Sequence, residues 1–138
     1  MRPLRIFIID ESKANIALIA MALNKQSYEC EVTSETNTNL ALVRLMEMSR
    51  TNAHSLPDVI LLGKLSEELN AVAVLCYLNT ANITERSAVV VICGYTDYNE
   101  RSLYLDNGAA HVIPWRFDCR ELEMGLSIFE EYALDTAR

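Results

Sequence analysis

The stretch LRIFIIDES, residues 4–12, joins an apolar segment to a polar turn and the start of a helix. Leu4–Ile9 is almost wholly apolar, which is typical of a strand buried on both faces of a parallel sheet. Asp10 and Glu11 follow at once, and Ser12 is a residue type that caps helix N-termini. A buried strand that leads directly into a helix is the repeating unit of an α/β fold.

The same alternation of short apolar runs and longer helical stretches continues along the chain. Four further runs are short enough to be buried strands, at 30–34, Val59–Leu62, Ala88–Cys93 and 110–113. Capping residues and a final glycine delimit five helices, expected over 12–25, 36–50, 70–78, 97–107 and 118–134, and either Thr36 or Asn37 can cap the second. This pattern predicts a doubly wound α/β fold around a five-stranded parallel sheet, in one domain over 1–138.

The composition is that of an acidic globular protein. Of 138 residues 51% are hydrophobic, and 12 basic side chains stand against 19 acidic ones, for a net charge of −7. That charge repels nucleic acids and anionic membranes, and no apolar run is long enough to span a bilayer. The four cysteines are spaced neither as a zinc site nor as a redox pair. We therefore expect a cytoplasmic protein with no nucleic-acid or membrane partner.

An open parallel sheet binds its ligands beyond the carboxyl ends of its strands, so the residues there are the informative ones. Segments at 6–12, 57–62, 89–94 and 108–113 resemble the receiver domains of response regulators, and the resemblance covers nearly the whole chain. Within that family the chain is most similar to single-domain, phytochrome-associated regulators, because of its SKANI pattern at 12–16. The resemblance implies a flavodoxin-like receiver fold with strand order 2-1-3-4-5 and a role in two-component signal transduction by phosphorelay.

The resemblance also implies a phosphorylation pocket, from which this chain departs. In receivers, two acidic residues after the first strand and an acceptor Asp after the third hold Mg²⁺. A hydroxyl residue and a Lys bind the phosphoryl oxygens. Here Asp10 and Glu11 match the acidic pair, but the remaining three positions hold Gly63, Cys93 and Trp115. The expected pocket is therefore degenerate and lacks its phospho-acceptor.

Neighbouring residues do not restore the missing groups. Lys64 cannot form an acyl phosphate, and Asp58 lies five residues before Gly63, about 16 Å away at roughly 3.3 Å per strand residue. We hypothesise that Lys64 or Arg116 neutralises the vestigial acidic pair, with solvated loop charges as the alternative interpretation. Because only two side-chain ligands remain, we expect Mg²⁺ to bind weakly if at all, and no other cofactor is implied.

Apolar residues in excess of what the sheet needs indicate protein contacts. Nine of the ten residues in 14–23 are apolar, so this helix lacks a polar face, unless its alanines simply tolerate water. A second stripe on the last helix and two tyrosines on the helix before it form a candidate interface: Met124, Ile128, Tyr132, Tyr98 and Tyr104. The stripe residues can equally be the edge of a wide core stripe.

These observations favour a phosphorylation-independent, non-enzymatic interaction module. It would act through protein–protein contacts, as a homodimer or bound to a sensor kinase or other signalling protein. The alternative is a receiver with residual Mg²⁺ binding or phosphoryl chemistry at a non-standard residue. A small-ligand-binding flavodoxin-like domain is a third possibility, with only the fold in its favour.

Overall fold

The central sheet, seen in a computed structural model, has five parallel strands in the order β2-β1-β3-β4-β5. The structure describes residues 2–94, 98–116 and 118–136. The strands are β1 (Leu4–Ile9), β2 (Cys30–Glu35), β3 (Val59–Leu62), β4 (Ala88–Cys93) and β5 (His111–Pro114). The predicted α/β class and strand order are confirmed.

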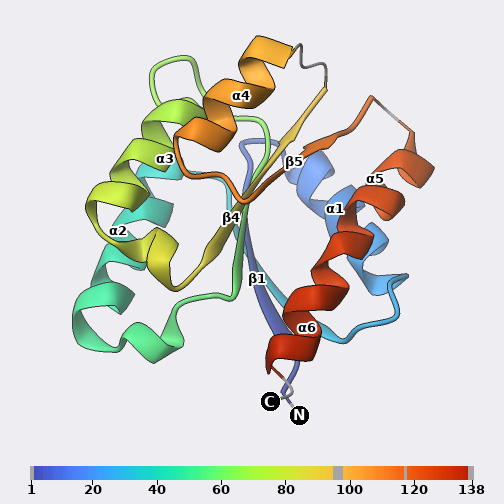
Figure 1. Cartoon of the computed structure of the whole chain (residues 1–138), viewed down its shortest axis with the longest axis horizontal. Helices are drawn as coiled ribbons and strands as arrows, with labels where there is room; N and C mark the ends of the chain where they lie inside the picture. Colours follow the sequence, from blue (N-terminus) through green and yellow to red (C-terminus); the bar gives the residue numbers. More distant parts are fainter. Residues whose placement is uncertain (1, 95–97, 117, 137–138) are drawn as a thin grey trace.

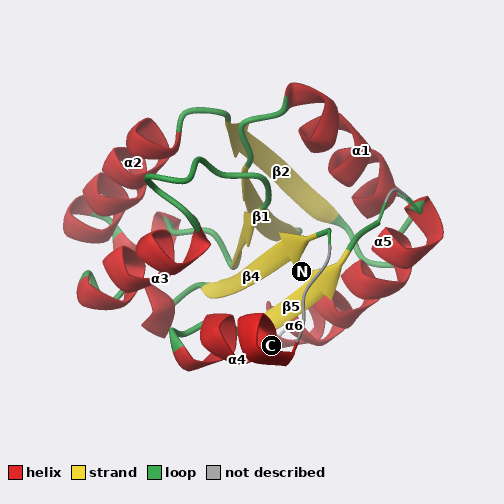
Figure 2. Ribbon diagram, turned by 90° about the horizontal axis from the view of Figure 1, so that it is seen from above, coloured by secondary structure: helices red, strands yellow, loops and turns green. Residues whose placement is uncertain are grey.

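Helices cover both faces of the sheet (Figure 1). They are α1 (Lys13–Asn24), α2 (Thr38–Thr51), α3 (Ala71–Thr80), α4 (Tyr98–Asp106), α5 (Cys119–Leu126) and α6 (Glu130–Thr136). Seen from above, α2, α3 and α4 lie on one side of the sheet and α1, α5 and α6 on the other (Figure 2). In the described part of the chain, no helix combines the length and the apolar character needed to cross a bilayer.

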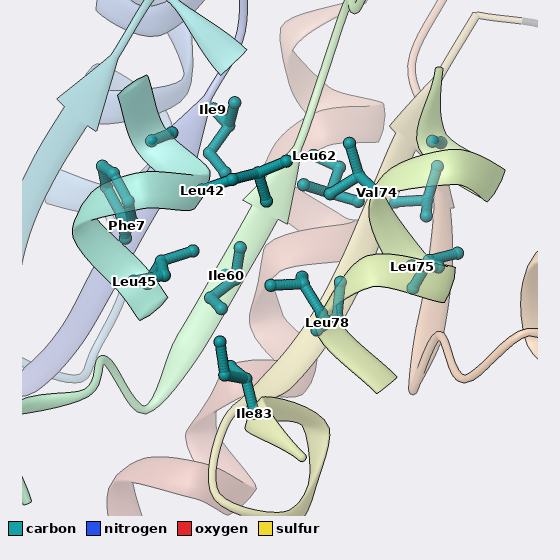
Figure 3. Packing of buried hydrophobic residues seen from close by; sticks show 14 of the residues in the cluster. Phe7, Ile9, Leu42, Leu45, Ile60, Leu62, Val74, Leu75, Leu78 and Ile83 are labelled. Carbon is teal, nitrogen blue, oxygen red and sulfur yellow. The ribbon is translucent and has the colours of Figure 1, made fainter. Parts of the chain in front are cut away.

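The core consists of two apolar layers, one on each face of the sheet. Side chains alternate along a strand, so Phe7 and Ile9 of β1 join the layer under α2 and α3, while Ile6 and Ile8 join the layer under α1 and α5. Figure 3 shows the first layer, where side chains from β1, α2, β3 and α3 meet. Burial on both faces explains why the strands are nearly continuous apolar runs.

The helix starts follow the predicted caps. The Ser12 hydroxyl accepts from the N–H of Asn15, and the Asp118 carboxylate accepts from the first turn of α5. Asn37, rather than Thr36, caps α2. The predicted cap at 97 lies outside the described residues. Gly108, two residues after the end of α4, has φ of +106°, the left-handed conformation expected at a helix C-terminus.

The last helix differs from the expectation of one continuous element over 118–134. α5 ends at Leu126, a 3-10 turn spans Ser127–Phe129, and α6 follows. Gly125 is a weak helix former at this point, and it lies so close to β5 that a Cβ would be 2.3 Å from Cγ2 of Ile113. The Ser127 hydroxyl also donates to the Met124 carbonyl, a local bond that tends to bend helices.

Candidate functional site

The parallel register brings the carboxyl ends of the strands to one edge of the sheet. Ile9 at the end of β1 lies beside Leu62 at the end of β3, and Cys93 of β4 lies beside Pro114 of β5. The backbone N–H of Trp115 then donates to the Cys93 carbonyl at 2.8 Å. The residues directly after these strands therefore form one candidate site, as the sequence predicts.

Asp10 is buried at the centre of this edge, with 1% of its surface exposed. Its Oδ1 accepts from the backbone N–H of Ser12 at 2.8 Å, and its Oδ2 accepts from the backbone N–H of Lys64 at 3.1 Å. The Asn15 side-chain amide donates to the same carboxylate at 3.3 and 3.4 Å. A buried carboxylate needs such donors, because burying it unpaired would be very costly.

Gly63 lies directly against this carboxylate. A Cβ built on Gly63 would be 2.1 Å from Oδ2 of Asp10 and 2.8 Å from its Cγ. The Gly63 N–H donates to the carbonyl of Ile9 at 2.9 Å, which fixes the two backbones in register. The space in which a side chain at residue 63 would begin is therefore filled by Asp10.

Glu11 differs from Asp10 in its environment, because Asp10 is buried and Glu11 is exposed. Glu11 is exposed and lines an open cleft of about 640 Å³ together with Thr38, Ser66 and Glu68. In the described ranges, no group of three or more His, Cys, Asp or Glu side chains is placed to hold a metal ion. Both Asp10 oxygens face amide donors, whereas Mg²⁺ takes several oxygen ligands.

Lys64 meets the acidic pair through its backbone rather than its side chain. Its N–H reaches Asp10, its carbonyl accepts from the N–H of Glu11 at 2.9 Å, and the residue itself is exposed. Arg116 is also exposed, and its N–H donates to Oε1 of Glu121 at 2.8 Å. The hydrogen bonds to Asp10 thus come from two backbone amides and Asn15, instead of the hypothesised charged side chains.

Cys93 and Trp115 complete the edge, and both are half-buried. Trp115 packs against the apolar layer under α1 and α5, and its indole N–H has no hydrogen-bond partner within the described residues. Tyr104 of α4 lies near Cys93. Burial, with a hydrogen bond from its hydroxyl to Glu100, raises the pKa of Tyr104 to about 12. Tyr104 is therefore a neutral hydroxyl at physiological pH.

The candidate interface residues are distributed differently from the expected stripe. Met124 is 75% exposed, whereas Ile128 and Tyr132 pack against the core as edge residues of the buried stripe. Tyr104 packs against the other layer, so it is not an exposed anchor. The side chain of Tyr98 lies outside the described residues.

The outer face of α1 is apolar, as predicted. Leu18 and Met21 are 39% and 60% exposed, and Ala14 and Ala17 are exposed on the same face. Lys25, one turn after Met21, forms an ion pair with Glu123 of α5 at 3.1 Å. The ion pair joins the C-terminal end of α1 to α5, on which Met124 is exposed.

Asn15 is the site residue that the sequence reasoning did not assign. It is the one polar residue among ten positions of α1 that are otherwise apolar, and its side chain contacts Asp10. The available signal was a side-chain amide in the first turn of an apolar helix, three residues after the cap. It indicates a polar contact at the end of β1, which in the structure is the contact of Asn15 with Asp10.

The fold is that of response-regulator receiver domains. No family model and no curated protein matches the chain. Its structure is similar to the phosphorylated cyanobacterial phytochrome response regulator RcpA, with a TM-score of 0.76, 24% identity, and coverage of 99% of this chain and 98% of RcpA.

Two further solved structures show the same likeness. The Mn²⁺-bound form of response regulator Rcp1 has a TM-score of 0.73 at 18% identity, covering 97% of this chain and 96% of Rcp1. The receiver domain of Francisella response regulator 1452 has a TM-score of 0.72 at 18% identity, covering 99% and 100%. At these identities the likeness shows the receiver fold.

Proposed function

We propose that this protein is a pseudo-receiver, a signalling module that works through protein–protein contacts without a phosphorylation cycle. The observation that carries the proposal is the contact between Gly63 and Asp10. The position that resembles the phospho-acceptor has no side chain, and the Asp10 carboxylate occupies the space where one would begin. Residue 63 therefore offers no carboxylate that could form an acyl phosphate, and the Asp10 carboxylate that fills its place is buried.

The other pocket positions support the same proposal. Phosphoryl transfer depends on positioning and on stabilising charge on the phosphoryl oxygens. Where the resemblance leads one to expect a hydroxyl and a lysine, this chain has Cys93 and Trp115. A thiol is a weak hydrogen-bond donor and an indole carries no charge, so neither replaces the missing groups. We propose that the protein is not an enzyme.

Metal binding is expected to be weak for the same structural reason. Hard cations take several oxygen ligands, and here Asp10 is turned toward amide donors while Glu11 faces the cleft. We propose that Mg²⁺ binds weakly if at all and that no other cofactor is needed. The Mn²⁺ and the phosphoryl group named for Rcp1 and RcpA are not carried over to this chain.

The partner that we propose is a protein, in keeping with the exposed apolar side chains of α1 and α5. A second copy of this chain, a sensor kinase or another signalling protein would each bury Leu18, Met21 and Met124. The net charge of −7 continues to disfavour nucleic acid and anionic lipid, and the cytoplasm is the expected location.

The fluorescence of Trp115 tests the proposal, because it is the single tryptophan and lies at the candidate site. Mg²⁺ is titrated first, and beryllofluoride is added next, while the emission of Trp115 is followed. We expect no saturable change. As a control, RcpA is titrated with the same reagents, and the fluorescence of a residue near its own site is followed. A response of RcpA shows that the reagents are active.

A saturable response at millimolar Mg²⁺ would contradict the proposal. It would favour the alternative function, a receiver that keeps residual metal binding or phosphoryl chemistry at a non-standard residue. A response to Mg²⁺ that disappears in Glu11→Gln would place that residual site at the cleft.

A further inference from the structure

Hydrogen-bond donors from two separate loops converge on one small volume at the end of β1. The Ser12 N–H, at the start of α1, and the Lys64 N–H, after β3, point to the two oxygens of one carboxylate. The Asn15 amide adds donors at 3.3 and 3.4 Å. Backbone amides from different loops, together with the N-terminal end of a helix, form the kind of site that binds an oxyanion.

The anion in this site belongs to the chain itself. Asp10 is 1% exposed, so its carboxylate is shielded from water and takes its hydrogen bonds from these donors. The loops are also joined to each other, because the Glu11 N–H donates to the Lys64 carbonyl at 2.9 Å. The carboxylate therefore ties together the ends of β1 and β3.

Gly63 is what allows Asp10 to take this position. A Cβ at residue 63 would be 2.1 Å from Oδ2, closer than any real contact, and the neighbouring atom is on a short side chain already held by three donors. The two residues therefore require each other: a side chain at 63 excludes the inward Asp10, and the inward Asp10 excludes a side chain at 63.

We propose that Ser12, Asn15 and Lys64 form an oxyanion site whose ligand is the carboxylate of Asp10. A site filled by a carboxylate of the same chain holds the ends of β1 and β3 in one state. This inference deepens the proposed function and rests on it for its biological meaning. We expect no external anion to displace the Asp10 carboxylate, because it is part of the same chain. The chemical class of ligand is a small carboxylate.

Removal of the tethered ligand tests the inference. In Asp10→Ala the donors lose their acceptor and a cavity opens, so the thermal midpoint falls by about 5 to 10 °C. Formate, which has the size and charge of the missing group, should restore most of that loss in a saturable manner. Chloride at equal ionic strength should not restore it, and formate should leave the wild type and the exposed neighbour variant Glu11→Ala unchanged.

The mutual requirement of Asp10 and Gly63 gives a second test, which needs no added ligand. Gly63→Ala lowers the thermal midpoint in the wild type, and the same substitution has little effect in the Asp10→Ala background, because the clash has been removed. If Asp10→Ala does not fold, Asp10→Ser replaces it in both tests, because its short side chain also leaves room for formate and for a Cβ at residue 63.

The inference is overturned if Asp10→Ala keeps the wild-type midpoint, if formate acts no better than chloride, or if the two substitutions are additive. These outcomes concern stability and leave the phosphorylation question open. A phosphoryl adduct or a Mg²⁺ response would instead contradict the proposed function, so the two failures are distinguishable.

Discussion

Asp10 and Gly63 share a volume that holds only one side chain. The sequence identifies both residues, because each directly follows an apolar strand at the same edge of the sheet. It does not show which way the Asp10 side chain turns. That direction depends on the space left by Gly63 and on one amide donor, the Lys64 N–H, which is 54 residues away in the chain. The hypothesis that Lys64 or Arg116 neutralises the acidic pair stays a hypothesis, and the hydrogen bond of Lys64 with Asp10 is made by its backbone N–H.

Adding an acceptor back to this site is expected to fail. Gly63→Asp places a Cβ against Oδ2 of Asp10 and a second carboxylate beside the first, so both sterics and charge oppose it. We expect the free energy of unfolding to fall by about 1–3 kcal/mol. Urea denaturation measures the loss, and intact mass spectrometry after treatment with a phosphoryl donor should show no adduct.

Gly94 provides the matched control for that substitution. It follows β4 at the same edge, and the nearest atom to an added Cβ is the Trp115 carbonyl oxygen at 3.8 Å. Gly94→Asp should therefore change the free energy of unfolding by less than about 0.5 kcal/mol. Equal losses at both glycines would contradict the argument that Asp10 fills the space at residue 63.

At the scale of elements, strands and helix starts were predictable and one helix interior was not. Apolar runs and capping side chains are local signals, so β3 and β4 were predicted with the bounds that the structure has, and Ser12 and Asp118 act as caps as expected. The break after α5 depends on how closely Gly125 approaches Ile113 of β5. The sequence signal for this break was Gly125, a weak helix former within the expected helix.

Asp58 joins the other ends of β1 and β3, and its ionisation gives a pH dependence. Both carboxylate oxygens accept from the Arg2 guanidinium at 2.7 Å, and Oδ2 also accepts from the Arg5 N–H at 2.8 Å. Burial raises the pKa of Asp58, but these hydrogen bonds and positive charges outweigh burial, so the pKa lies below its ordinary value of 3.8. Asp58 therefore stabilises the fold above about pH 4, and this contribution is lost as the pH falls through the lowered pKa.

Asp58→Asn is expected to lower the free energy of unfolding by about 1 kcal/mol at pH 7, a modest value because Arg2 is largely exposed. The difference from the wild type should shrink as the pH falls below the ordinary value of 3.8. Urea unfolding at a series of pH values measures it, with the exposed loop variant Glu67→Gln as the control. If the difference in the free energy of unfolding between the wild type and Asp58→Asn stays constant down to acid pH, the Asp58–Arg2 ion pair is not its source.

At the scale of the whole molecule, exposed large apolar side chains lie on both sides of the sheet, and those on the α1 and α5 side are Leu18, Met21 and Met124. The sequence predicted an apolar face on α1, and Leu18 and Met21 are exposed there. The interface predicted on the last helix stays a prediction: Met124 is 75% exposed, while Ile128 and Tyr132 are partly buried and pack against the core, which was the alternative left open by the sequence. Helical periodicity does not distinguish a core edge from an exposed stripe, since that depends on how wide the sheet is beneath the helix.

Association in solution tests whether this surface binds a second copy of the chain. Met21→Glu should shift a self-associated protein to the monomer without loss of stability, because Met21 is 60% exposed. Val43→Glu on α2, where Val43 is 58% exposed on the opposite side of the sheet, is the matched control and should not change the assembly. Light scattering after size exclusion measures the mass. A wild type that is monomeric at high concentration would remove the homodimer and leave a different protein as the partner.

The most direct test of the central claim is the intact mass of the protein after incubation with Mg²⁺ and a small-molecule phosphoryl donor. RcpA, the phosphorylated response regulator with the same fold, is treated alongside to show that the donor is active. Because Gly63 offers no acceptor carboxylate and Asp10 is held by amide donors, we expect an unchanged mass. A stoichiometric gain of one phosphoryl group would contradict it.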